Sequence, residues 1–178
     1  MNLFKLISSD FKAIKENDPA ARNWLETLLC HHPFYAILNY RVAHKLWTFK
    51  IPILPRFLCQ VAKIFTGVEI HPAAKIGKSF FIDHGTGVVI GETSEIGNWV
   101  TIYQGVTLGG KGGRGEKRHP TLKNNVLIGA NAILLGPIIV EDDAVIGAAS
   151  VVLRNVPVGA TVVGNPGKVI KINGRSVR

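Results

Sequence analysis

The sequence contains few cysteines. Only Cys30 and Cys59 occur in 178 residues, both in apolar, helix-like surroundings. So few thiols exclude a disulfide scaffold and favour a reducing compartment. Both side chains are expected to be buried and structural. A hydrophobic content of 47% is ample for a core, which argues against a disordered chain.

Long apolar runs are also lacking. Residues 1–17 have no apolar stretch long enough for a signal peptide. Residues 51–70 are interrupted by two prolines, an arginine and a lysine, so they do not fit a membrane span. We therefore expect a cytoplasmic protein with no membrane partner.

Acidic residues are fewer than basic residues. Twelve Asp and Glu oppose 21 Lys and Arg, a net charge of +9, and such an excess attracts anions. The basic residues do not form a basic helix or alternate with aromatics, which argues against a nucleic-acid partner. They gather in residues 111–118 and 168–178. This placement favours a phosphate-bearing small molecule such as a coenzyme A derivative.

Residues 1–66 have helical patterns and are expected to form a small N-terminal α-helical region. Asp18 and the proline after it predict the N-cap and first turn of a helix that runs to Cys30. Pro33 predicts the start of the next helix. The region is too small for a large core of its own and is expected to cover an open end of the repeat region that begins near residue 67. Two apolar faces are predicted here, one through Phe34, Ile37, Leu38, Val42 and Leu46, and one through Phe57, Leu58, Val61, Ile64 and Phe65.

From Ile70 to Val163, apolar residues recur every six positions. A helix has a period near 3.6 and a strand a period of 2, so neither explains this pattern. A six-residue period fits a parallel β-solenoid, in which each repeat is a short strand and a turn. At about three repeats per triangular coil, we expect four to five coils over residues 67–165 and a tail over 166–178. The anchors in register are Ile70, Ile76, Ile82, Ile90, Ile96, Ile102, Leu108, Leu122, Ile128, Leu134, Val140, Ile146, Val152 and Val158.

The six-residue register is interrupted twice. The first interruption is a slip of two residues at Asp83 and His84. The second is a glycine-rich segment that predicts a protruding loop over about residues 109–121. Chemistry is often carried by loops on a rigid scaffold, and both interruptions contain a histidine.

His84 is the candidate general base, because histidine accepts a proton near neutral pH. Glu69 could orient its imidazole or stabilise the imidazolium. Arg118, beside His119, could bind a carboxylate. The alternatives are that His84 is a surface residue next to a turn glycine and that Arg118 and His119 belong to a solvated loop. His71 is expected to be a turn residue.

A nucleotide-binding loop and a metal site are both disfavoured. The segment KGGRGEK (111–117) lacks the ending of a P-loop, and no helix follows it. Its amides and basic side chains could still bind a pantetheine or a phosphate. A zinc site would need three converging histidines, and the spacing of His71, His84 and His119 lacks a close pair, so no metal is expected. The remaining histidines, His31, His32 and His44, are expected to be structural or solvated.

Several motifs together resemble the bacterial serine O-acetyltransferases. They are GVEIHPAAKIGKSFFIDHGTGVVIGET, QGVTLGG and KRHPTLKNNVLIGANAILLG, with DPAARNWLETLLCHHPFYAILNYRVAHKLW upstream. The six-residue repeats alone would indicate only the wider acyltransferase superfamily. The resemblance covers roughly residues 8–170 and implies a mainly β protein, a left-handed parallel β-helix, that forms homotrimers with active sites between neighbouring chains. Long forms of the family use extra helices to form hexamers, so a trimer is expected rather than a hexamer.

The resemblance implies acetyl transfer from acetyl-CoA to the L-serine hydroxyl, the first step of cysteine biosynthesis from serine. Acetyl-CoA would be a co-substrate, with no permanently bound cofactor. Carried over by position, the implied roles are His84 as general base with Glu69 as its acidic partner, Asp18 and Asp83 for the serine ammonium, Arg118 and His119 for its carboxylate, the Gly110 amide at the thioester, and Ala130, Ala148 and Lys168 along the coenzyme groove.

Some alternatives stay open. Family members that bind cysteine synthase end in isoleucine, whereas this sequence ends in Gly-Arg-Ser-Val-Arg, so cysteine synthase is an open partner. A sister acyltransferase that acts on a sugar or a xenobiotic, or a non-catalytic solenoid used in assembly, would share the repeats. Asp18 and the Arg118-His119 pair favour an amino acid, because a zwitterion needs one anionic and one cationic contact.

Overall fold

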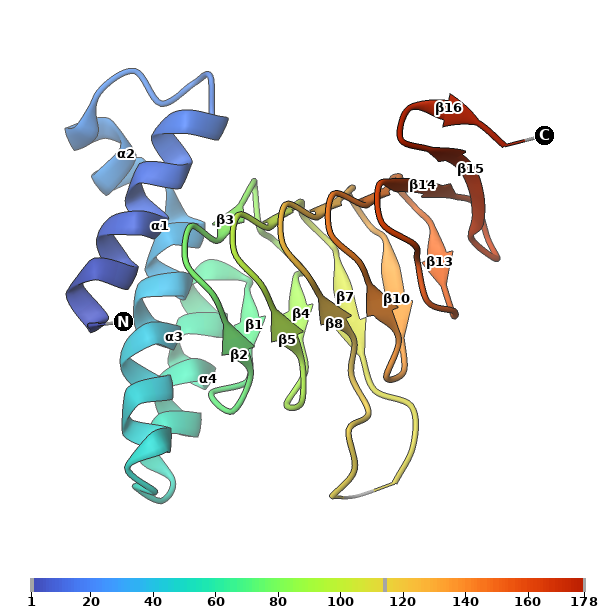
Figure 1. Cartoon of the computed structure of the whole chain (residues 1–178). Helices are drawn as coiled ribbons and strands as arrows, with labels where there is room; N and C mark the ends of the chain where they lie inside the picture. Colours follow the sequence, from blue (N-terminus) through green and yellow to red (C-terminus); the bar gives the residue numbers. More distant parts are fainter. Residues whose placement is uncertain (1, 114, 178) are drawn as a thin grey trace.

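A computed structural model describes residues 2–113 and 115–177 as a β-solenoid with helices at one end (Figure 1). The helices are α1 (Leu3–Asn17), α2 (Trp24–Cys30), α3 (His32–Thr48) and α4 (Leu54–Thr66). They cover the first coil, and the C-terminal strands lie at the opposite end of the solenoid (Figure 1). No helix among the described residues is long and apolar enough to cross a bilayer.

The solenoid has three flat faces of parallel strands, as a left-handed β-helix requires. Sheet A contains β1 (Glu69–Ile70), β4 (Val89–Ile90), β7 (Thr107–Gly109), β10 (Ile133–Leu135) and β13 (Val151–Val152). Sheet B contains β2 (Lys75–Ile76), β5 (Glu95–Ile96), β8 (Thr121–Leu122) and β11 (Ile139–Val140). Sheet C contains β3 (Phe81–Ile82), β6 (Thr101–Ile102), β9 (Leu127–Ile128), β12 (Val145–Ile146) and β14 (Ala160–Val163), followed by the antiparallel β15 (Lys168–Ile172) and β16 (Arg175–Ser176).

The predicted anchors form the core of this solenoid, with one exception. All of them from Ile70 to Val152 are buried. The prediction for Val158 is wrong, because its side chain is 52% exposed. The last coil departs from the six-residue register: Val156 pairs with Val140 instead, and Ala160 and Val162 fill the interior.

The predicted N-cap at Asp18 is also wrong. Asp18 ends α1, and its Oδ1 accepts a hydrogen bond from the Ala20 amide at 2.8 Å, which forms a turn. The helix cap lies at Asn23, whose Oδ1 accepts from the Glu26 amide at 2.8 Å. The helix is therefore shorter than predicted, and Asp18 lies in the loop before it.

The start of α3 agrees with the prediction, because Pro33 occupies its first turn, and Pro55 occupies the first turn of α4 in the same way. Arg41 on α3 joins the helices to the first coil. Its guanidinium binds the buried Asp10 carboxylate of α1 at 2.9 and 3.0 Å and donates to the Ile76 carbonyl at 2.6 Å. This buried ion pair orients α1 and α3 on the end of the solenoid.

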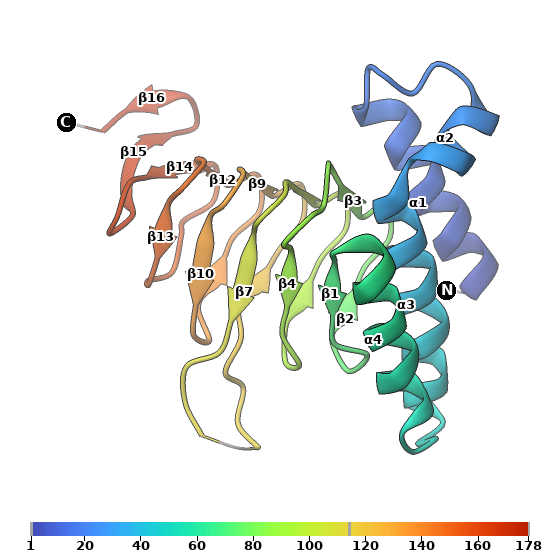
Figure 2. The same cartoon turned by 180° about the vertical axis from the view of Figure 1, so that it is seen from behind.

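The apolar face of α4 points outward. Phe57, Ile64 and Phe65 are 61%, 71% and 82% exposed, and Figure 2 shows α4 beside β1 at the end of sheet A. Cys59 is buried as expected, and burial raises the pKa of its thiol to about 11. The same expectation is wrong for Cys30, which is exposed at the end of the short α2.

Candidate functional site

The coils turn at three corners, and most of the predicted site residues of the solenoid lie on two of them. We call the turns between sheets C and A the His84 corner; they comprise residues 83–88, 103–106, 129–132 and 147–150. We call the turns between sheets A and B the loop corner; they comprise residues 71–74, 91–94, 110–120 and 136–138. The loop corner includes the predicted loop, which protrudes from the solenoid in both views (Figures 1 and 2).

Backbone hydrogen bonds stack the coils in register at the His84 corner. The Gly105 amide donates to the Thr86 carbonyl at 2.9 Å, and the Ala149 amide donates to the Ala130 carbonyl at 2.8 Å. His84 and the predicted groove residues Ala130 and Ala148 therefore share one edge of the solenoid. Three coil steps of about 4.8 Å separate the Thr86 and Ala148 turns, roughly 14 Å along the axis.

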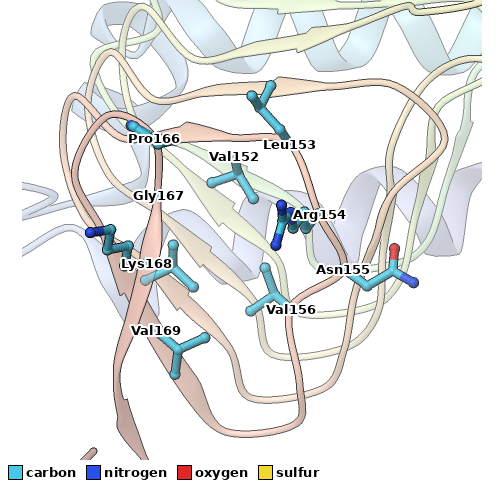
Figure 3. Close-up of a pocket in the computed structure, with 10 residues that line it drawn as sticks. Val152, Leu153, Arg154, Asn155, Val156, Pro166, Gly167, Lys168 and Val169 are labelled. Atoms are coloured by element: carbon cyan, nitrogen blue, oxygen red, sulfur yellow. The ribbon is translucent and has the colours of Figure 1, made fainter. Parts of the chain in front are cut away.

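Lys168 continues this edge at the C-terminal end. It pairs with Val163 across β14 and β15. The end of the solenoid also holds a cavity of about 590 Å³ lined by valines, Arg154 and Lys168. In Figure 3 the valine side chains surround this space, whereas the Lys168 side chain points away from its centre. The ammonium of Lys168 thus lies at the surface and not inside the cavity.

His84 is exposed in a turn that holds its backbone in the left-handed region, with φ +57°. Histidine is among the side chains that adopt this region more readily. Its imidazole makes no hydrogen bond within residues 2–113 and 115–177. Gly85 follows it, and a Cβ there would lie 2.9 Å from Pro33 Cγ, so this glycine lets the turn pack against α3. The imidazole is therefore open to a substrate.

Glu69 lies next to this turn but does not contact His84. Its amide donates to the Val88 carbonyl at 2.9 Å. Its carboxylate pairs with Lys63 Nζ of α4 at 2.5 Å. Glu69 therefore lies beside the His84 turn, but its carboxylate contacts Lys63 and not the imidazole, so the predicted pairing with His84 is not formed in this structure.

His31 links Asp18 to the His84 corner, and the sequence predicted no role in the site for this histidine. The His31 ring stacks on Phe81, and its Nε2–H donates to the Ile82 carbonyl at 3.2 Å. Its Nδ1 is 3.9 Å from Asp18 Oδ2. Burial lowers the pKa of His31, and the charges of Asp18 and Asp83 oppose that shift. His31 therefore lies between the helical region and the first coil, beside both predicted ammonium ligands.

The loop corner holds the predicted carboxylate site. Arg118 Nη2 donates to Glu92 Oε2 at 2.7 Å. His119 is only 7% exposed, and burial, together with the charge of Arg118, lowers its pKa. A Cβ at Gly110 would lie 3.0 Å from His119 Nε2, so the start of the loop reaches this ring. Arg118, His119 and Gly110 are therefore brought together.

His71 has the turn role that its sequence position predicts. Its Nδ1 accepts from the Ala73 amide at 3.1 Å, and the Trp47 ring contacts it edge-on. No group of three potential metal ligands occurs in the part of the chain that the structure describes. Arg114 of the loop lies outside the described residues.

The two corners do not meet within one chain. Sheet A separates them: from Val88 to Gly91 the chain crosses its face in three residues, roughly 10 Å. One small amino acid cannot contact His84 and Arg118 of the same solenoid. The candidate site is therefore two half-sites.

Sequence reasoning missed Glu92, Thr93 and Gln104 as well as His31. Glu92 and Thr93 contact the end of the loop, and the Gln104 side-chain oxygen at the His84 corner is buried with no hydrogen-bond partner among the described residues. Contacts between coils could have been inferred from the repeat, because Glu92 and Thr93 occupy the loop corner one coil earlier.

The three-faced parallel solenoid and its two interrupted corners define a class of protein. A family model described as bacterial transferase hexapeptide (six repeats) matches residues 119–154. The matched segment lies within the solenoid, and its class is that of the hexapeptide-repeat transferases.

Whole-chain comparisons identify the family. The chain is 55% identical to a serine acetyltransferase of Synechococcus elongatus over 97% of this chain and 70% of the relative. It matches a serine acetyltransferase structure from Vibrio cholerae with a TM-score of 0.93 and 39% identity, over 99% of this chain and 67% of that one. It also matches soybean serine acetyltransferase in complex with serine, with a TM-score of 0.91 and 45% identity over 94% and 69% of the two chains. The chain belongs to the serine acetyltransferase family.

Proposed function

We propose that this protein transfers the acetyl group of acetyl-CoA to the hydroxyl of L-serine, giving O-acetyl-L-serine and CoA, the first step of cysteine biosynthesis from serine. The observation that carries the proposal is the charge of the two half-sites. Asp18 and Asp83 place carboxylates at the His84 corner, and Arg118 places a guanidinium at the loop corner. A zwitterionic amino acid needs both.

In this mechanism, His84 removes the proton from the serine hydroxyl while that oxygen attacks the thioester carbonyl. The carbon–oxygen bond forms, and the oxyanion of the tetrahedral intermediate accepts a hydrogen bond from the Gly110 amide. The intermediate then collapses, the carbon–sulfur bond breaks, and the His84 imidazolium protonates the thiolate that leaves. Glu69, beside the turn, stabilises the imidazolium once its carboxylate turns from Lys63 toward His84.

Acetyl-CoA lies along the His84 corner in this proposal. The small side chains of Ala130 and Ala148 leave room for a long, narrow chain on the edge of the coils. Lys168 lies beyond them, at the end of the edge away from His84, and attracts phosphates there. Acetyl-CoA enters and leaves as a co-substrate and is not held permanently.

Two copies of the chain must combine their corners to complete a site. A ring of three closes when the loop corner of each chain meets the His84 corner of the next, which is a heterologous interface. The exposed apolar face of α4, beside sheet A, supports such an interface. We therefore propose a homotrimer.

A direct assay tests the proposal. Purified protein is incubated with acetyl-CoA and L-serine, and free thiol is measured, with glycine as the acceptor that lacks only the hydroxymethyl group. Of these two acceptors, we expect only L-serine to give thiol release. Release with amino sugars or xenobiotics but not with serine would favour the sister acyltransferase, and no release with any acceptor would favour a non-catalytic solenoid.

A further inference from the structure

The Thr93 hydroxyl uses all of its hydrogen-bonding positions in contacts with Arg118 and His119 at the end of the loop. Its Oγ1 accepts from the Arg118 and His119 amides, both at 3.0 Å. The same oxygen lies 2.9 Å from His119 Nδ1. A hydroxyl has one donor and two acceptor positions. Because two N–H groups occupy the acceptor positions, the hydroxyl proton points to Nδ1.

A second donor converges on the same ring nitrogen. The Thr93 amide donates to His119 Nδ1 at 3.2 Å. With two donors aimed at it, Nδ1 must be unprotonated, so the proton of the neutral ring is on Nε2. Nε2 is the nitrogen that faces Gly110 at the start of the loop.

The position of the ring is fixed as well. A Cβ on Gly91 would collide with Cδ2 and Nε2 of His119, so only glycine leaves room for the ring there. The loop is closed at its base by the Lys111 amide, which donates to the Arg118 carbonyl at 2.8 Å. Lys117 Nζ also donates to the Thr93 carbonyl at 2.5 Å. Thr93 thus lies at the centre of the contacts that order the end of the loop.

We propose that Thr93 is a positioning residue of the substrate-carboxylate site: it holds His119 as the neutral Nε2–H tautomer and fixes Arg118 beside it. The pair then presents an N–H donor and a guanidinium in fixed positions. Glu92 binds one guanidinium nitrogen of Arg118, which leaves the other guanidinium donors for the substrate carboxylate. The identity of the substrate rests on the proposed function, whereas the tautomer does not.

The test compares Thr93→Val, which removes the hydroxyl at nearly constant shape, with Thr93→Ser, which retains it. A net hydrogen bond contributes modestly to stability, so we expect Thr93→Val to raise the KM for serine about tenfold. The kcat and the KM for acetyl-CoA should change less than about twofold, and Thr93→Ser should stay close to wild type. Equal serine KM values for the Val and Ser variants would overturn the proposal.

Histidine ¹⁵N NMR supplies a readout that does not depend on activity. In the wild-type protein the His119 signals should report a proton on Nε2 and none on Nδ1 at neutral pH, and Thr93→Ser should retain this pattern. Thr93→Val should give a mixture of tautomers. A wild-type ring protonated on Nδ1 overturns the proposal even if no variant folds. The expected spectrum without any acetyl transfer would instead overturn the proposed function and leave the role of Thr93 intact.

Discussion

The two corners hold their histidines in opposite ways. His84 is exposed in a left-handed turn, and its ring makes no hydrogen bond within the described part of the chain. His119 is buried, and its Nδ1 has two donors from Thr93. A base must gain and lose a proton, so its ring has to be open, whereas a binding group works best when its donor is fixed. The difference fits the proposed roles, with proton transfer at the His84 corner and carboxylate binding at the loop corner.

Removing His84 tests the first half of this comparison and should have the largest effect. Loss of a general base lowers turnover by about a hundred- to ten-thousand-fold. We expect such a fall in kcat for both His84→Ala and His84→Asn, measured by thiol release. The Asn variant is the matched control, because asparagine also tolerates φ +57° without supplying a base. A near-normal kcat in a folded His84→Asn variant would contradict the assignment.

Mixing two impaired variants tests whether the corners act across chains. His84→Ala keeps a working loop corner, and Arg118→Ala keeps a working His84 corner. If each site joins corners of neighbouring chains, every mixed trimer that carries both tags has one complete site in three, so about one third of the wild-type sites are restored. The variants are co-expressed with different tags, purified through both tags and assayed at a serine concentration near the wild-type KM.

Two controls accompany the mixing experiment. Each variant carrying both tags is purified in the same way to measure its own residual activity. No recovery in the mixed oligomer would show that both corners serve a single chain, which contradicts the two half-sites.

Removing the Arg118 side chain tests carboxylate binding at the loop corner on its own, and its effect should be smaller than that of removing His84. Hydrogen bonds to charged groups are worth about 1.5–3 kcal/mol, so Arg118→Ala should raise the KM for serine about 10- to 100-fold. The KM for acetyl-CoA should change little, because Arg118 and Lys168 lie at different corners. Lys12→Ala is the charge-matched control, on the exposed side of α1. An unchanged serine KM in Arg118→Ala would move the carboxylate site elsewhere.

Much of the scaffold could be predicted from the sequence because the six-residue period is a local signal. Each anchor reports its own inward position, and all of them up to Val152 are buried. The signal fails at Val158 because the final coil has no further coil above it to maintain the register. It also fails in the helices, where Asp18 forms a turn instead of a cap.

The site was harder to predict because its geometry depends on contacts between distant residues. The interruptions at His84 and at the loop are visible in the sequence. Their placement at two corners becomes apparent only when the coils are wound. His31 contacts Ile82, 51 positions away in the sequence and outside the repeat, so no local spacing could have paired them. Thr93 contacts His119, 26 positions away, and this pairing could be inferred only after the repeats had been assigned to coils.

The smallest expected effect is on stability at low pH, and it sharpens the description of the loop corner. Burial lowers the pKa of His119 and of His71 below the usual 6.5. Between the lowered value and 6.5 the unfolded chain binds more protons than the folded chain, so the free energy of unfolding rises with pH. The contribution of the two neutral rings to the free energy of unfolding is fully present above about pH 6.5 and is lost as the pH falls through the folded-state pKa values. Urea unfolding at constant protein concentration, from pH 8 to 5, should therefore show a slope that His119→Gln reduces and that the further change His71→Gln reduces again. An unchanged slope in the double variant would show that neither ring is held neutral by the fold.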